Sequence, residues 1–99
     1  MTINKTATDT ALTLALEGRL DTTTAPALEE ELKNSLEGVA ELTLDFEKLD
    51  YISSAGLRVL LKAQKKMNTV GSMKVTHVND AIMEVFTITG FDSILTIEQ

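Results

Sequence analysis

The chain has 99 residues, of which 43% are apolar, and this length and composition favour one domain with a single core. Its net charge of −6 disfavours binding to nucleic acid or to an anionic membrane surface, since both attract basic proteins. Cysteine is absent, which excludes a disulfide framework and a thiolate metal site. No signal-like or membrane-length apolar run is present, so we expect a cytoplasmic protein without membrane insertion.

Two strands are predicted at the N-terminus. Residues 2–7 form a weak, polar candidate that is typical of a sheet edge. Residues 11–17 alternate leucines with other residues, so one face of this strand is expected to be buried. Thr8-Asp9-Thr10 between them indicates a turn. The two strands are therefore expected to form a hairpin.

The first helix is predicted to follow the interruption of the alternating pattern at residues 18–21. Residues 22–24 are threonines that can supply N-cap hydroxyls, and Pro26 suits the first helical turn. Leucines recur every four residues as far as Leu36, which predicts one buried face. Gly38 is typical of a residue that follows a helix end.

The rest of the chain alternates strands with helices. We expect a strand at 41–46, a helix at 55–68, a strand at 73–78, a helix capped by Asn79 or Asp80 and ending near Thr89, and a strand at 94–97. The order β-β-α-β-α-β-α-β predicts an α/β fold with three helices and a mixed, mostly parallel sheet. Binding sites in such sheets gather at the carboxyl ends of the strands, where residues 18–21, 53–56 and 77–80 are expected.

The junction before the helix at 55–68 consists of four small residues, Ser53-Ser54-Ala55-Gly56. Ser54 immediately precedes the predicted helix, where a serine N-cap contributes about 1 kcal/mol. A glycine in the first helical turn costs roughly 0.5–1 kcal/mol relative to alanine. Gly56 therefore indicates either the close approach of a partner or tight packing of the helix on the sheet.

The start of a helix also favours negative charge, because its N–H groups point outward and the helix dipole is positive there. Phosphorylation of Ser54 would add a charge of about −1.5 to −2 beside those donors. Such a change suits a switch that a partner reads. Farther along the helix, one face carries basic residues and is either an ordinary solvated face or a strip that meets an acidic partner: Arg58, Lys62, Lys65 and Lys66.

These features resemble the STAS domain family, whose single-domain members include the anti-sigma factor antagonists of bacteria. The family motif is an apolar pair followed by Asp-Ser-[Ser/Thr]-Gly-Leu, and Tyr51-Ile52-Ser53-Ser54-Ala55-Gly56-Leu57 is similar to it. The serine that is phosphorylated in the family lies two residues before the glycine, which is Ser54 here. Ser53 replaces the family aspartate, and Ala55 replaces the second hydroxyl residue, which removes a competing phosphorylation site.

The resemblance covers nearly the whole chain and implies a single STAS domain at residues 1–99. Gly18-Arg19-Leu20-Asp21 is similar to the Gly-Glu-Leu-Asp turn of the family, with Arg19 in place of the glutamate. Gly90-Phe91 is similar to the residue pair that follows the third helix of the family.

The function implied by the resemblance is partner switching. The unphosphorylated domain would bind an anti-sigma factor that is a serine kinase and free a sigma factor. Phosphorylation would end binding, and a PP2C-type phosphatase would reset the switch. The protein itself would be no enzyme and would hold no cofactor or metal, because the ATP and the metal belong to the kinase. The partner-binding residues would be Asp21, Ser53, Ser54, Ala55, Gly56, Leu57 and Arg58.

Two of these residues carry a further expectation. Asp21 would lie near Ser54 and help to present or reset it, and Leu57 would be either an apolar contact or an ordinary core leucine. Two other functions stay open. One is a STAS-type regulatory subunit of a transporter ATPase or a signalling scaffold. The other is a small serine hydrolase using Ser54 and His77, although the chain lacks Gly-x-Ser-x-Gly. No Walker-type loop supports nucleotide binding.

Overall fold

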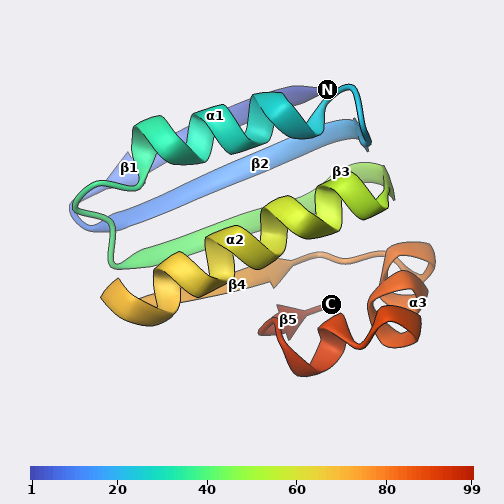
Figure 1. The fold of residues 1–99 in the computed structure, drawn as a ribbon. Helices are drawn as coiled ribbons and strands as arrows, with labels where there is room; N and C mark the ends of the chain where they lie inside the picture. Colours follow the sequence, from blue (N-terminus) through green and yellow to red (C-terminus); the bar gives the residue numbers. More distant parts are fainter.

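The computed structural model describes residues 1–99 and contains one five-stranded sheet in the order β1-β2-β3-β4-β5 (Figure 1). The edge strand β1 (Thr2–Thr8) pairs antiparallel with β2 (Ala11–Leu20), which confirms the hairpin. The following neighbours pair in parallel: β3 (Glu41–Ile52), β4 (Ser72–Thr76) and β5 (Ile97–Glu98). The predicted α/β class and element order are confirmed.

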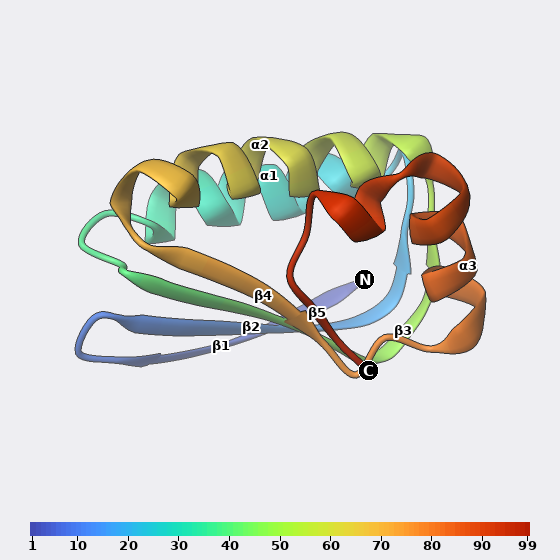
Figure 2. The same cartoon turned by 90° about the horizontal axis from the view of Figure 1, so that it is seen from below.

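The long helices α1 (Ala25–Ser35) and α2 (Ser54–Val70) lie side by side on one face of the sheet (Figure 2). The shorter helix α3 (Asp80–Thr89) packs at the end of the sheet, where the Asn79 side-chain amide donates to the Leu49 carbonyl at 3.0 Å. The opposite face of the sheet carries no helix. None of the helices is long and apolar enough to cross a lipid bilayer.

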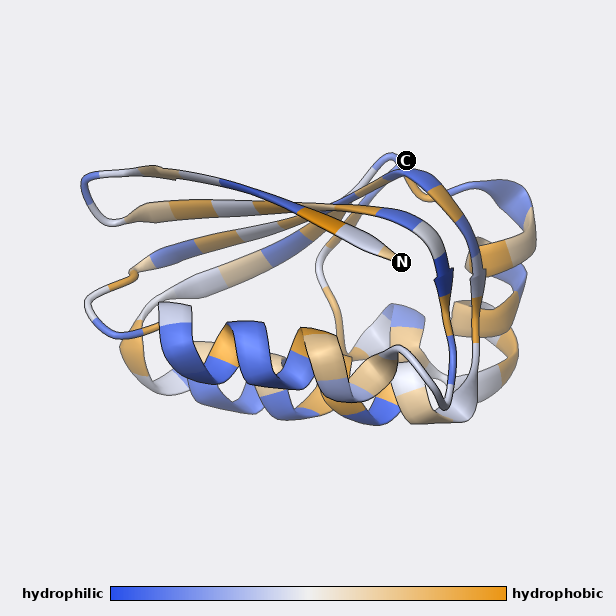
Figure 3. Cartoon of the chain, turned by 90° about the horizontal axis from the view of Figure 1, so that it is seen from above, coloured by the Kyte–Doolittle hydropathy of each residue, from blue (hydrophilic) through white to orange (hydrophobic).

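The core fills the space between the sheet and the two long helices. Along the regular part of the sheet, every second residue faces this core, as the alternating colours of Figure 3 show. The inward residues of the two central strands are almost fully buried: Leu12, Leu14, Leu16, Leu42, Leu44 and Phe46. Burial of such leucines contributes about 1.5–3 kcal/mol each, so the alternation predicts these two strands well.

Beyond Phe46 the alternation stops, but β3 continues to Ile52. The register with β2 shifts twice, and each shift places an extra residue in β3, as in a β-bulge. The buried positions accordingly follow at intervals of three, at Phe46, Leu49 and Ile52. Both strands bend sharply here toward the helices (Figure 3). Gly18 lies at the second shift with φ +101°, a conformation that favours glycine.

Several predicted boundaries are therefore wrong. The strand expected at 11–17 reaches Leu20, and the strand expected at 41–46 reaches Ile52, because bulges hide the period of two. Conversely, β4 ends at Thr76, and His77 adopts a left-handed conformation with φ +55° that an extended strand does not accommodate. The strand expected at 94–97 is reduced to Ile97–Glu98, after a short 3-10 helix at Phe91–Ser93.

Candidate functional site

The bent ends of β2 and β3 pack against the junction of residues 53–56, which contains the start of α2. The Ser53 N–H donates to the Leu20 carbonyl at 2.9 Å, which fixes the chain where it leaves β3. A Cβ atom at Gly56 would lie 2.8 Å from Leu20 Cγ and 2.9 Å from Ile52 Cγ1. Tight packing of α2 on the two strand ends therefore explains the glycine, without the approach of a partner.

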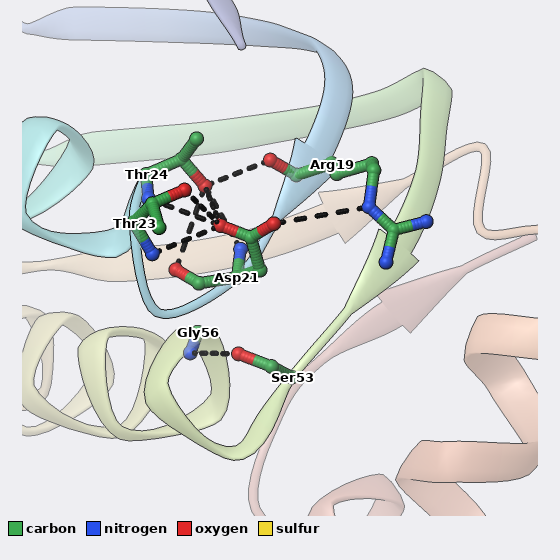
Figure 4. A network of polar contacts seen from close by, with 6 residues as sticks. All are labelled: Arg19, Asp21, Thr23, Thr24, Ser53 and Gly56. Atoms are coloured by element: carbon green, nitrogen blue, oxygen red, sulfur yellow. Dashed lines mark hydrogen bonds and ion pairs between the residues drawn. The ribbon is translucent and has the colours of Figure 1, made fainter.

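The N-cap of α2 is Ser53, not Ser54 as the sequence predicted. Ser53 has extended backbone angles, and its Oγ accepts a long hydrogen bond of 3.4 Å from the Gly56 N–H (Figure 4). Its carbonyl accepts the first helical bond from the Leu57 N–H at 2.9 Å. Ser54 is thus the first residue of the helix, and it is exposed. The two serines have different roles, since one holds the helix start and the other leaves its hydroxyl at the surface.

Asp21 closes the neighbouring turn before α1. One oxygen, Oδ1, accepts from the Thr23 N–H at 3.0 Å, the Thr23 hydroxyl at 2.7 Å and the Thr24 N–H at 3.2 Å (Figure 4). These bonds, led by that of the Thr23 hydroxyl, hold the pKa of Asp21 below its usual value. The sequence predicted that the threonine hydroxyls cap α1, and this prediction is wrong, because no threonine side chain makes a capping hydrogen bond there. The Thr24 hydroxyl instead accepts from the Asp21 N–H and donates to the Arg19 carbonyl, both at 2.8 Å.

Arg19 and Tyr51 form a pair that sequence reasoning missed. They are aligned in the register of β2 and β3, and the Arg19 guanidinium lies 4.2 Å from the centre of the Tyr51 ring. Arg19 Nε also lies 3.8 Å from Asp21 Oδ2. Tyr51 is 41% exposed. Both residues belong to recognised motifs, but only a count that includes the two bulges would have paired them.

The remaining junction residues differ in exposure. Leu57 is 6% exposed and belongs to the core, so it supports the surface from beneath. Ala55 is half-buried and Arg58 is exposed, and both line a groove of about 250 Å³ between the first turns of α1 and α2.

The basic strip of α2 is partly paired with α1. Lys62 Nζ lies 2.7 Å from Glu29 Oε2 of α1, and this hydrogen bond lowers the pKa of Glu29. Lys62 is therefore engaged within the protein.

His77 is engaged away from the junction. Its Nδ1 lies 2.9 Å from Asp45 Oδ1, and it forms no hydrogen bond with Ser54. Asp45, Glu47 and His77 are the residues whose ligand atoms lie close enough to hold a metal ion, within 4.8 Å of one another. Glu47 and His77 are exposed, and Asp45 is half-buried. The Ser-His pair of a hydrolase is not formed in this arrangement.

The chain belongs to the STAS domain family, whose model matches residues 2–99. It is 38% identical over 91 residues to BtrV of Bordetella bronchiseptica, a protein named as an anti-sigma factor antagonist. That match covers 90% of this chain and 78% of the relative. The family predicted from the junction motif and the element order is confirmed.

Solved structures share the fold. A protein of Thermotoga maritima described as an anti-sigma factor antagonist matches with a TM-score of 0.91 and 18% identity, covering 98% of this chain and 86% of that one. The anti-sigma factor antagonist SpoIIAA of Bacillus matches in its unphosphorylated form with a TM-score of 0.78 and in its phosphorylated form with 0.77. These two matches have 16% and 17% identity and cover 99% of this chain, with 87% and 92% of the others.

Proposed function

We propose that the protein is an anti-sigma factor antagonist whose switch is phosphorylation of Ser54. The observation that carries this proposal is the division of roles at the junction. Ser53 caps α2, so the exposed Ser54 hydroxyl can be modified without loss of the capping bond. The names of relatives and the existence of a phosphorylated form of SpoIIAA support the same function.

The reaction on this chain is a phosphoryl transfer in which the protein is the substrate. The Ser54 hydroxyl oxygen bonds to the γ-phosphorus of ATP while the bond from that phosphorus to the leaving ADP oxygen breaks. The hydroxyl proton passes to a base of the kinase. A PP2C-type phosphatase reverses the modification by hydrolysis. Catalytic groups, ATP and metal ions are contributed by these cytoplasmic partners.

The docking surface lies around Ser54 at the start of α2. Its members are Asp21, Ser53, Ala55, Gly56, Leu57 and Arg58, with Leu57 and Gly56 acting through shape because both are buried. In the unphosphorylated state its two charged members, Asp21 and Arg58, have opposite signs. A phosphate adds a charge of about −1.5 to −2, and desolvating that charge opposes the complex. Binding to the kinase is therefore lost after phosphorylation, and the sigma factor is sequestered again.

The test uses lysate of the source organism and the full chain in three forms: wild type, Ser54→Ala and Ser54→Asp. The wild type and Ser54→Ala should retain a serine kinase, and Ser54→Asp should not. The retained kinase with ATP should place one phosphate on Ser54, as located by mass spectrometry. Ser53→Ala is the matched control, because it removes the neighbouring hydroxyl and should still be phosphorylated. A phosphate on Ser53, or no phosphorylation at all, would refute the proposal.

A further inference from the structure

Arg58 is a cation without a partner beside the proposed phosphorylation site. It is exposed, and it takes part in none of the ion pairs of the molecule. Other nearby cations are engaged, since Lys62 bonds to Glu29 at 2.7 Å and Arg19 lies over Tyr51 and beside Asp21. The nearby acids are engaged as well, because Asp21 binds the turn before α1 and Glu29 binds Lys62.

The helix geometry directs Arg58 toward Ser54. The two residues are four apart within α2, so they lie on the same face of the helix. Helical side chains lean toward the N-terminus, and the stem of Arg58 therefore runs over the first turn, where Ser54 lies. An acidic group four residues before a basic one is the favourable order, since it also agrees with the helix dipole.

We infer that Arg58 binds the phosphate of phosphorylated Ser54 and folds it against the start of α2. This inference rests on the proposed function and deepens it. The guanidinium fork stays charged and donates to two phosphate oxygens, while the first N–H groups of the helix lie on the other side of the phosphate.

The consequence is a second change at the docking surface. Before phosphorylation, Arg58 offers a free cation to a partner. After phosphorylation, the same side chain is held by the phosphate, so the surface loses its cation and also gains negative charge. A partner with an acidic group opposite Arg58 would then lose an attraction and meet a repulsion. The modified protein keeps its fold, because the new pair lies within one helix.

The test installs phosphoserine at position 54 of the full chain during translation, so it requires no kinase. The second pKa of the phosphate is measured by phosphorus NMR in proteins with Arg58 or Arg58→Gln. Loss of the guanidinium should raise this pKa by about 0.3 unit. This shift corresponds to the stabilisation that an i,i+4 ion pair would give to the dianion of the phosphate. Arg58→Lys should recover part of the shift. Lys66→Gln is the matched control, since Lys66 lies about 18 Å from Ser54 along the helix, beyond the screening length.

The thermal midpoint gives a second measurement. Arg58→Gln should lower the midpoint of the phosphorylated protein more than that of the unphosphorylated one. A phosphate pKa that is unchanged by Arg58→Gln would overturn the inference, and so would a larger shift in Arg19→Gln than in Arg58→Gln. Because the phosphate is installed without a kinase, a failure of the proposed partner switching would leave these measurements unchanged. The two failures can therefore be told apart.

Discussion

The starts of α1 and α2 lie next to each other but are built differently. The turn before α1 is closed by its own carboxylate, since Asp21 accepts from two backbone N–H groups and one hydroxyl within the turn. The start of α2 has only the hydroxyl of Ser53, at 3.4 Å from the Gly56 N–H. One helix start thus already holds an anionic group, and the other is left able to receive one.

The difference shows how the first turn of α2 is held in place while its outer side stays open to solvent. What fastens α2 is its packing on the sheet at Gly56 and the bond between the Ser53 N–H and the Leu20 carbonyl. Its first turn is therefore held from below, while its outer side remains exposed at Ser54. We therefore expect a negative group added there to change the surface without disturbing the contacts that position the helix.

The largest expected effect comes from breaking that packing with Gly56→Ala. The added Cβ would meet Leu20 Cγ at 2.8 Å and Ile52 Cγ1 at 2.9 Å, so the helix or the strand ends must move. We expect a loss of about 1–3 kcal/mol in the free energy of unfolding, measured by urea denaturation. The higher helix propensity of alanine offsets only part of this loss.

Ala55→Gly is the matched control for that substitution. It removes a methyl group from the neighbouring position and should cost about 0.5–1 kcal/mol through helix propensity, with a further small loss because Ala55 packs partly against the core. If Gly56→Ala were instead as stable as the wild type, the glycine would not be required for packing. In that case a need for close approach by a partner would be the remaining explanation.

The sequence predicts the regular half of the molecule well and the junction less well. Leu12, Leu14 and Leu16 obey the period of two, and that period follows directly from strand geometry. The bulges in β3 change the spacing to three at Leu49 and Ile52, and nothing in the residue types marks where an extra residue is inserted. A shift of one residue in register also decides which side chains share a face.

The hidden register also explains why the N-cap of α2 was predicted at Ser54 and not at Ser53. Ser53 and Ser54 have equal capping ability, so the sequence alone does not decide between them. The choice depends on where β3 ends, and the bond between the Ser53 N–H and the Leu20 carbonyl fixes that position. The pairing of Arg19 with Tyr51 was hidden for the same reason, because it requires both bulges to be counted. Recognition of the family motif needed no knowledge of the register, and it gave Ser54 as the proposed phosphorylation site.

The second prediction concerns the cap of α2. Ser53→Ala should lower the free energy of unfolding by about 0.5–1 kcal/mol, at the low end of the capping range because the bond is long. Ser53→Asp should restore the loss, since a carboxylate caps well and suits the positive end of the helix. Urea denaturation of the three proteins measures both effects. A loss in Ser53→Asp equal to that in Ser53→Ala would show that position 53 does not act as a cap.

The third prediction compares the two helix starts by adding a negative charge to each. Ser54→Asp should leave the fold intact and raise the free energy of unfolding by about 0.3–0.5 kcal/mol through the helix dipole. Thr23→Asp should lower it, because the new carboxylate repels Asp21 and replaces the hydroxyl that donates to it at 2.7 Å. Thermal unfolding at low salt measures both changes. Destabilisation by Ser54→Asp would show that the start of α2 does not tolerate an anion.

The smallest expected effect is the pH dependence that Asp21 brings to the turn before α1. The hydrogen bond from the Thr23 hydroxyl, with those from the backbone, lowers the pKa of Asp21 in the folded state. A lowered folded pKa means that the stabilisation is present above the unfolded pKa of about 3.9 and is lost as the pH falls through the folded pKa. Asp21→Asn should therefore be less stable than the wild type at pH 7, and the two should converge in acid.

Urea denaturation of both proteins between pH 7 and pH 2 tests this behaviour. The pKa of Glu29 is also lowered, by the Lys62 hydrogen bond, but Glu29 is present in both proteins and its contribution cancels from the difference. A difference that stays constant down to pH 2 would mean that the charge of Asp21 does not hold the turn. In that case the starts of α1 and α2 would differ in shape but not in electrostatics. The contrast drawn between the anion held before α1 and the open position at Ser54 would then lose its electrostatic basis.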